Sequence, residues 1–236
     1  MRLLLLSNST NAGEDYLEWA LEAIKDFLGG EEQELLFIPY AAVTFSWDEY
    51  ERKAARPFEE IGHRLVSLHR AADERKAVEE AEVIVVGGGN TWHLLRTLQE
   101  KELLDPLRTR VQAGVPYIGW SAGSNLACPT IMTTNDMPIV EPYDFKALGL
   151  IPFQINPHYL DANPEGHAGE TREMRIREFL KLHPDIYVAG LREGTLLNRE
   201  GQHLRLQGPR PMRLFREGMR PVELTSHDNL DFLLID

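Results

Sequence analysis

Short apolar runs alternate with longer amphipathic segments over the first two thirds of the chain. Apolar runs of about four residues favour buried strands, whereas apolar residues spaced three and four apart favour helices. The expected strands are Leu3–Leu6, Leu35–Ile38, Leu65–Leu68, Val83–Val86 and Tyr117–Gly119, and the expected helices are Tyr16–Leu28, Trp47–Ile61, Ala72–Ala81, Thr91–Gln99 and Leu103–Ala113. Strands separated by helices predict an α/β fold with a doubly wound, mostly parallel sheet and helices on both faces.

The pattern changes after about residue 130. Thr130–Tyr143 is typical of loops and short strands, Glu170–Leu182 predicts a helix, and Ile186–Ala189 predicts a strand. Residues 196–224 indicate β-hairpins with turns at Gly201 and Gly218. The sequence contains no repeat, low-complexity tract or linker, so we expect one α/β domain over residues 1–236.

The segment Gly119-Trp120-Ser121-Ala122-Gly123 follows a predicted strand and leads into a run of small residues. In a strand–turn–helix context, G-x-S-x-G is typical of a nucleophile elbow, because the glycines allow a strained turn that exposes the serine hydroxyl. The alternative is an ordinary loop whose serine caps a helix.

A second glycine-bearing turn, Gly87-Gly88-Gly89-Asn90, also follows a predicted strand. Both turns should therefore lie at the carboxyl edge of the sheet, where such folds bind ligands. The run lacks the Lys-Ser/Thr of a P-loop and the G-x-G-x-x-G spacing of dinucleotide folds. An oxyanion hole formed by the backbone N–H of Ala122 with that of Gly88 or Gly89 is a better interpretation.

A serine nucleophile needs a base, and His158 is the first candidate. It follows Pro157 at the end of an apolar segment, where a rigid backbone can hold an imidazole for proton transfer. The alternative is a buried structural histidine. His167 is the second candidate, on a more flexible segment. Histidines among charged residues are expected to be solvated: His63, His69, His203 and His227.

Two carboxylates could orient the base. Asp136 lies between the serine and His158 in sequence, and Glu193 follows an apolar strand. Either could instead be a loop acid in water, and spacing does not separate them.

Arg172 and Arg175 fall on one face of a predicted helix, near its start. Arginine in a first helical turn opposes the helix dipole, so an anion is expected nearby. Surface pairing with neighbouring glutamates is the alternative.

Composition narrows the class of protein. The formal charge is −12, from 25 Lys and Arg against 37 Asp and Glu, which argues against nonspecific binding to nucleic acid or an anionic membrane. The single cysteine, Cys128, allows no intrachain disulfide and favours a cytoplasmic location. We expect it to be buried. The apolar run at the start is shorter than the roughly 7 to 15 residues of a signal peptide core, so a first strand is the better interpretation.

Taken together, several long segments resemble the peptidase E family of serine peptidases, and the similarity runs over nearly the whole length. The matching segments are Leu3–Thr10, Val85–Thr91, Tyr117–Gly123, Asn125–Ile131, Thr133–Val140, Gln154–His158, Pro164–His167 and Gly169–Glu173. The resemblance implies the fold of the class I glutamine amidotransferases, with serine in place of their cysteine nucleophile. It also implies hydrolysis of dipeptides with an N-terminal aspartate, without a cofactor or metal.

By position, the resemblance makes Ser121 the nucleophile and His158 the base. It matches both Glu193 and Asp136 to acids assigned to the triad. Arg172, with Asn90, would bind the aspartyl side chain of the substrate. Arg192 departs from the family pattern, which has proline before the glutamate.

Two other functions stay open from the sequence. One is a cyanophycinase-like enzyme that cleaves β-aspartyl bonds, and the other is a noncatalytic small-molecule binding protein on the same fold. The sequence also leaves open the second residue of the substrate and whether the protein is a monomer or a homodimer.

Overall fold

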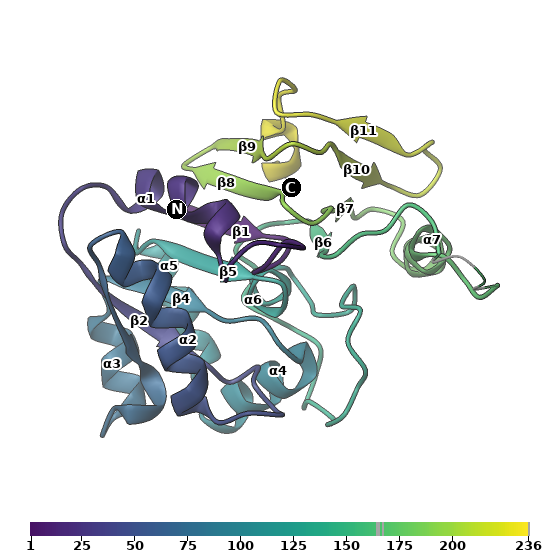
Figure 1. Cartoon of the computed structure of the whole chain (residues 1–236). Coiled ribbons are helices and arrows are strands. Elements are labelled where there is room, and N and C mark those ends of the chain that lie inside the picture. The colour runs from purple at the N-terminus through teal and green to yellow at the C-terminus, as the bar shows by residue number, and fades with distance from the viewer. Residues whose placement is uncertain (164–165, 167, 236) are drawn as a thin grey trace.

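Two β-sheets lie side by side in the computed structural model, which describes residues 1–163, 166 and 168–235 (Figure 1). The larger sheet has seven strands in the order β3-β2-β4-β5-β1-β8-β9. The bounds of its strands are β1 Arg2–Leu6, β2 Glu34–Ile38, β3 Arg64–Ser67, β4 Val83–Val86, β5 Tyr117–Trp120, β8 Leu196–Glu200 and β9 His203–Gln207. The first five strands in this order pair in parallel, whereas β8 is antiparallel to β1, and β9 to β8.

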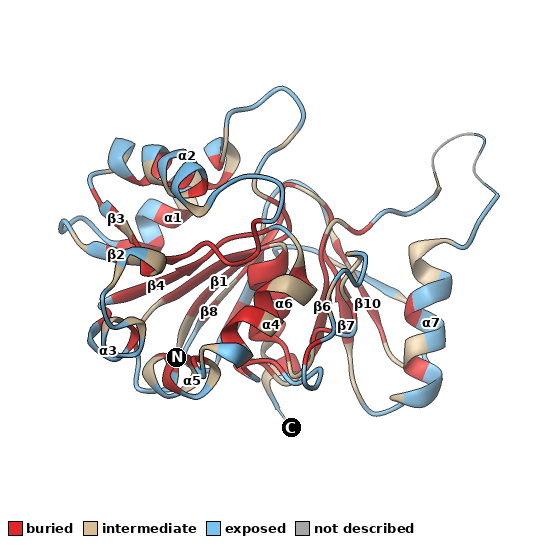
Figure 2. Ribbon diagram, turned by 90° about the horizontal axis from the view of Figure 1, so that it is seen from below, coloured by how far each residue is buried: buried red, intermediate tan, exposed pale blue. Residues whose placement is uncertain are grey.

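Helices cover both faces of the larger sheet (Figures 1 and 2). Their bounds are α1 Leu21–Leu28, α2 Trp47–Glu60, α3 Glu74–Glu80, α4 Thr91–Glu100, α5 Leu104–Gln112 and α6 Ala122–Ala127. Successive side chains of a strand point to opposite faces. Leu4 and Leu6 of β1 accordingly pack in the cluster with α1 and α2, whereas Leu3 and Leu5 pack in the cluster with α4, α5 and α6. The predicted α/β fold with a mostly parallel sheet is confirmed.

The smaller sheet has the strand order β11-β10-β7-β6. Its strands are β6 Gln154–Asn156, β7 Val188–Gly190, β10 Met212–Phe215 and β11 Val222–Leu224. Strands β6 and β7 are parallel, and β10 is antiparallel to both β7 and β11. Helix α7, Arg172–Leu182, packs against this sheet through Ile176 and Leu180, which share a buried cluster with Val188 and Phe215.

The expected helix Tyr16–Leu28 is wrong in its first part. Leu17 has a φ of 60°, and its N–H donates to the carbonyl of Ser9 at 2.7 Å. This positive φ interrupts the helical path, so a 3₁₀ turn at Glu18–Ala20 precedes α1. The spacing of apolar residues did not predict this break, because Leu17 is buried and so continues the apolar pattern of the helix.

Two side chains differ in environment from most polar residues of the chain. His63, expected to be solvated, is only 4% exposed, and burial lowers the pKa of its imidazole below the usual value. The charged residues near it in sequence, Glu60 and Arg64, are exposed, whereas His63 itself is buried. Cys128 is buried as expected, and burial raises the pKa of its thiol to about 12. None of the helices in the described residues is both long and apolar enough to cross a membrane.

Candidate active site

Four neighbouring strands bring separate segments of sequence to one edge of the larger sheet. β4, β5 and β1 are parallel neighbours, so the residues that follow them, Gly87, Ser121 and Ser7, lie at the same edge. Strand β8 runs antiparallel beside β1, with Leu196 opposite Leu6. The turn before β8, which contains Glu193, therefore also lies at this edge.

Ser121 occupies a sharp turn between β5 and α6. Its φ of 52° and ψ of −108° are strained for a residue with a side chain, and its N–H donates to the carbonyl of Leu6 at 3.0 Å. A Cβ at Gly119 would lie 2.6 Å from the carbonyl oxygen of Gly123, and a Cβ at Gly123 would lie 2.3 Å from that of Val86. Both glycines are therefore required by close backbone packing, and the segment has the geometry of a nucleophile elbow.

His158 follows β6 and faces Ser121. Its Nε2 lies 2.9 Å from Ser121 Oγ. The residue has a φ of 51°, and its N–H donates to Ser7 Oγ at 2.9 Å. Ser7 Oγ in turn donates to the carbonyl of Leu191 at 2.8 Å. The hydroxyl of Ser7 thereby links the backbone of His158 to the segment between β7 and Glu193.

Glu193 contacts the other imidazole nitrogen, since its Oε1 lies 2.8 Å from His158 Nδ1. A carboxylate only accepts, so Nδ1 carries the hydrogen and Nε2 is free to accept from Ser121. Glu193 sits in a tight turn in which Thr195 N–H donates to the Arg192 carbonyl at 3.2 Å and Gly194 has a φ of 78°. The carboxylate side chain is 44% exposed and the imidazole 39% exposed, so the site is open to solvent.

Asp136, the other acid considered from the sequence, is placed elsewhere. Its Oδ2 accepts from the N–H of Thr91 at 2.8 Å, the hydroxyl of Thr91 at 2.6 Å and the hydroxyl of Thr134 at 3.0 Å. Both ring nitrogens of His158 already have partners, so Asp136 is not the acid beside the imidazole. It instead accepts hydrogen bonds from the first residue of α4 and so stabilises the start of that helix.

Asn90 is the N-cap of α4. Its Oδ1 accepts from His93 N–H at 3.0 Å, and its Nδ2 donates to the carbonyl of Met137 at 2.9 Å. Both ends of the side-chain amide are thus used to hold α4 and the loop at Met137 together. The contacts of Asn90 in this structure are structural ones.

Gly88 and Gly89 lie beside the elbow. A Cβ at Gly88 would be 2.9 Å from Trp120 Cδ1 and 3.2 Å from Ser121 Cβ, so glycine lets the loop lie close to the serine. Gly89 has a φ of 135°, which also favours glycine. Within the described part of the chain, the N–H groups of Gly88 and Gly89 have no hydrogen-bond acceptor.

Arg172 is the first residue of α7, after the N-cap Thr171. It is half-buried, and burial together with the nearby charge of Arg175 lowers the pKa of its guanidinium from the ordinary value, while Asp136 opposes this change. Arg175 is exposed and lies 3.7 Å from the carboxylate of Glu170. The two arginines therefore differ: Arg175 is paired at the surface, whereas Arg172 is half-buried and senses the charge of Asp136.

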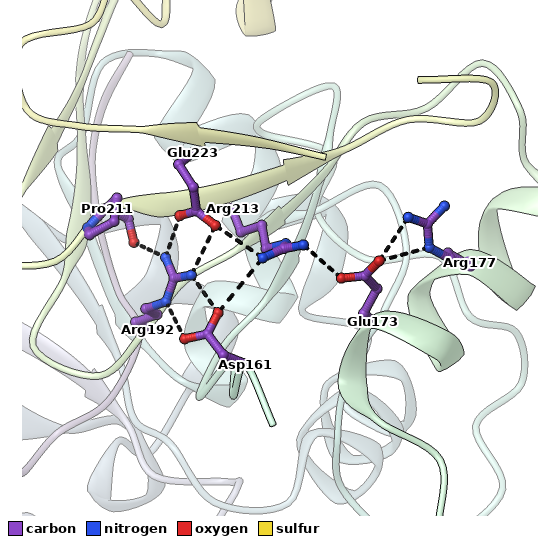
Figure 3. Close-up of polar contacts among 7 residues, drawn as sticks. All are labelled: Asp161, Glu173, Arg177, Arg192, Pro211, Arg213 and Glu223. Atoms are coloured by element: carbon purple, nitrogen blue, oxygen red, sulfur yellow. Dashed lines mark hydrogen bonds and ion pairs between the residues drawn. The ribbon is translucent and has the colours of Figure 1, made fainter. Parts of the chain in front are cut away.

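Arg192, the departure from the family pattern, is the centre of an ion-pair network (Figure 3). Its side chain is 10% exposed and binds the carboxylates of Asp161 and Glu223. Arg213 contacts Glu223 at 3.2 Å and Glu173 at 2.8 Å. The paired carboxylates raise the pKa of Arg192, and the hydrogen bond from Arg192 lowers that of Asp161. The turn that carries Glu193 is therefore tied to α7 and β11.

Sequence reasoning missed two polar residues that shape the site, Ser7 and Asn8. Asn8 Oδ1 accepts from Gly194 N–H at 2.8 Å, beside Glu193. The sequence could have indicated both residues, because polar residues that directly follow a buried parallel strand lie at the carboxyl edge of the sheet. His167, the second candidate base, lies outside the described residues.

One cluster of possible metal ligands is found in the described residues, away from the elbow. Ligand atoms of Asp48, Glu51 and His69 lie within 4.8 Å of one another. The guanidinium of Arg70 pairs with both carboxylates, at 2.6 Å and 2.5 Å. The arginine already supplies the positive charge of this cluster.

Comparison with known proteins gives the family. The model of peptidase family S51 matches residues 3–207. The Peptidase E of Nostoc sp. is 53% identical over 233 residues, 99% of this chain and 96% of the relative. The Peptidase E of Salmonella typhimurium is 51% identical over 224 residues, 95% of this chain and 97% of the relative.

A solved structure shares the fold. The crystal structure of a peptidase from an acI-B1 actinobacterium matches with a TM-score of 0.71 at 20% identity, and covers 97% of this chain and 96% of that one. The family match and the relatives agree with the elbow geometry at Ser121. The chain belongs to peptidase family S51 and is a serine peptidase.

Proposed function

We propose that this protein hydrolyses dipeptides with an N-terminal aspartate, with Ser121 as nucleophile, His158 as general base and Glu193 as the acid that orients it. The observation that carries the proposal is the continuous line of hydrogen bonds Glu193 Oε1–His158 Nδ1 at 2.8 Å and His158 Nε2–Ser121 Oγ at 2.9 Å. This is the arrangement that activates a serine hydroxyl at neutral pH.

In the first half of the reaction, Ser121 Oγ forms a bond to the scissile carbonyl carbon while its proton passes to His158 Nε2. The C–N bond then breaks, and the imidazolium returns this proton to the leaving amine. In the second half, water attacks the aspartyl ester, His158 takes the water's proton, and that proton returns to Ser121 Oγ as aspartate leaves. Glu193 stabilises the imidazolium in both halves.

The oxyanion of each tetrahedral intermediate needs hydrogen-bond donors. We assign this role to the N–H of Ala122 with that of Gly88 or Gly89. Supporting the assignment, Gly88 packs against the serine, and the glycine N–H groups have no acceptor in the described part of the chain.

Arg172 is the proposed ligand of the substrate's aspartyl carboxylate. It is half-buried, and Asp136, the carboxylate whose charge acts on it, already accepts hydrogen bonds from Thr91 and Thr134. The two oxygens of a carboxylate can each accept a hydrogen bond from an N–H group of the guanidinium. The neutral amide of Asn would leave the charge of the arginine uncompensated. We therefore expect the enzyme to cleave Asp-X dipeptides in preference to Asn-X dipeptides.

The test is turnover of Asp-Leu by the wild type, Ser121→Ala and the exposed-loop control Ser226→Ala. The wild type and Ser226→Ala should cleave Asp-Leu, and Ser121→Ala should lose at least about 1000-fold in kcat. Retained turnover in a folded Ser121→Ala protein would reject the nucleophile.

Two further substrates decide the specificity. Asn-Leu should be cleaved at least about 100-fold more slowly than Asp-Leu in kcat/KM. Preference for a β-aspartyl dipeptide would replace the proposal with the cyanophycinase-like alternative. Absence of turnover with all three substrates would favour a noncatalytic binding protein.

A further inference from the structure

The phenol of Tyr50 reaches from α2 to the two segments that flank Ser121. Its hydroxyl donates to the carbonyl of Gly88 at 2.8 Å and accepts a hydrogen bond from Trp120 Nε1 at 3.1 Å. Gly88 belongs to the glycine run after β4, and Trp120 immediately precedes Ser121. One buried group therefore ties the glycine loop to the strand end that carries the serine.

The direction of each hydrogen bond around Tyr50 follows from the chemistry of its partners. A carbonyl oxygen only accepts and an indole N–H only donates, so the proton of Tyr50 goes to Gly88. The hydroxyl of Tyr16 lies 3.2 Å away and takes the remaining acceptor position of Tyr50. Burial raises the pKa of Tyr50 to about 12, so the group stays protonated at neutral pH. All of its hydrogen-bonding capacity is used.

The bond to Gly88 fixes more than one atom. The carbonyl of Gly88 and the N–H of Gly89 belong to one planar peptide unit, and the described residues contain no cis peptide bond. In a trans peptide these two groups point in opposite directions. Holding the carbonyl toward Tyr50 therefore turns the N–H of Gly89 away from Tyr50.

The glycine run is shaped around this contact. A Cβ at position 87 would lie 2.5 Å from Tyr50 Oη, and a Cβ at position 88 would lie 2.9 Å from Trp120 Cδ1. The absence of a side chain at position 87 therefore leaves room for the phenol of Tyr50, and its absence at position 88 leaves room for the indole of Trp120. The ring of Tyr50 also packs edge-on against the rings of Phe37 and Phe45, with distances between ring centroids of 5.0 Å and 5.2 Å, so its position is fixed.

We propose that Tyr50 is a positioning residue that holds the Gly88–Gly89 peptide so that the Gly89 N–H faces the oxyanion formed at Ser121. The inference rests on the proposed function, which gives the glycine loop its catalytic role. It selects Gly89 from the two glycines as the second donor. Donors fixed in advance stabilise a transition state without reorganisation, so a loosened donor lowers kcat rather than substrate binding.

The test compares Tyr50→Phe with Tyr159→Phe. Both changes remove one buried phenolic hydroxyl, but in the described residues the hydroxyl of Tyr159 has no hydrogen-bond partner. The readouts are kcat and KM for Asp-Leu and the inhibition constant of the boronic acid analogue of aspartate, whose boron forms a tetrahedral adduct with a serine oxygen. KM and the inhibition constant do not depend on the fraction of folded protein.

For Tyr50→Phe we expect kcat to fall about 10- to 100-fold and the boronate inhibition constant to rise by a similar factor, with KM within about 3-fold of the wild type. Tyr159→Phe should match the wild type in all three. Equal kcat and inhibition constants in Tyr50→Phe and Tyr159→Phe would overturn the proposal, as would a loss confined to KM.

Two measurements keep the outcome clear. If Tyr50→Phe does not fold, Tyr16→Phe removes one of the bonds that orient the phenol, and it should lower kcat about 3-fold with KM unchanged; no change in kcat would count against the proposal. If the wild type does not cleave Asp-Leu, that failure concerns the proposed function. The rate at which a small fluorophosphonate labels Ser121 then replaces kcat, because its phosphoryl oxygen needs the same donors, and an unchanged rate in Tyr50→Phe would refute the positioning role.

Discussion

Ser121 and His158, 37 residues apart, both have a positive φ that strains a residue with a side chain, 52° and 51°, and 2.9 Å separates Ser121 Oγ from His158 Nε2. Each is held by one of two consecutive residues at the end of β1: Ser121 N–H donates to the Leu6 carbonyl, and His158 N–H donates to the Ser7 hydroxyl. Strain of about 1 to 3 kcal/mol at each residue persists only where neighbouring contacts impose it. The end of β1 is therefore the common support of the proposed nucleophile and base.

Removing the hydroxyl of Ser7 tests this support. Ser7→Ala should lower kcat for Asp-Leu about 10-fold, because the N–H of His158 loses its acceptor and the imidazole is less well held. Stability should fall by about 1 to 2 kcal/mol in urea unfolding. Ser67→Ala, a buried serine at the end of β3 on the edge of the same sheet, is the control: it should lose stability without a change in kcat. A Ser7→Ala enzyme with wild-type kcat would contradict the role of Ser7.

The two acids should behave differently when neutralised. Glu193→Gln removes the charge that stabilises the imidazolium and should lower kcat at least about 100-fold. Asp136→Asn should keep kcat within about 10-fold and instead destabilise the protein by about 1 kcal/mol, because it weakens the first turn of α4. Steady-state kinetics and thermal unfolding of both variants give the comparison. The reverse order of the two kcat effects would exclude Glu193 as the acid.

The close packing behind the elbow predicts a large cost for a single methyl group. At Gly123, a Cβ would lie 2.3 Å from the carbonyl oxygen of Val86, which is backbone and cannot move aside. Gly123→Ala should destabilise the protein by about 2 kcal/mol or more, despite the better helix propensity of alanine. Gly30→Ala, where a Cβ meets nothing within 4 Å, should be neutral. Urea unfolding of both variants checks this, and equal stabilities would mean that the elbow is not tightly packed.

Specificity for aspartate is expected to depend on Arg172 and not on its neighbour Arg175. Arg172→Met should reduce kcat/KM for Asp-Leu at least about 100-fold, since the substrate carboxylate loses its charge partner. Arg175→Met, which removes an exposed arginine paired with Glu170, should stay within about 2-fold. Kinetics with Asp-Leu and Asn-Leu measure the effect. Comparable losses in the two variants would point to a general charge effect of the helix.

The Arg192 network predicts a pH-dependent contribution to stability. The hydrogen bond from Arg192 holds the pKa of Asp161 below its ordinary value of 3.8. A carboxyl group whose pKa is lower in the folded state stabilises the protein above its unfolded pKa, which is close to this ordinary value, and the contribution is lost as the pH falls through the folded value. Asp161 is 55% exposed, so solvent screens the interaction.

Arg192→Met should therefore reduce stability at pH 7, and its difference from the wild type should shrink as the pH falls below about 4. Urea unfolding of both proteins between pH 7 and pH 3 measures this difference. A difference that stays constant over this range would show that Arg192 contributes through packing instead.

The pattern of apolar residues was sufficient to predict the five parallel strands of the larger sheet. Leu3–Leu6, Val83–Val86 and Tyr117–Gly119 are short, apolar and bounded by polar or glycine residues, and all three became central strands. The elbow was also visible, because the sterics of a tight strand-to-helix turn restrict positions 119 and 123 to glycine. Local chemistry determines such features, so the sequence alone reveals them.

Contacts between distant segments were decided only by the tertiary structure. Nothing in the spacing of Asp136 and Glu193 showed which one meets His158, because that depends on β8 running antiparallel beside β1 and on the turn at Gly194. The environment of Arg192 likewise comes from Asp161 and Glu223, which lie 31 residues to either side of it. Side-chain partners such as these follow from strand order and turn geometry, and a local pattern carries no information about either.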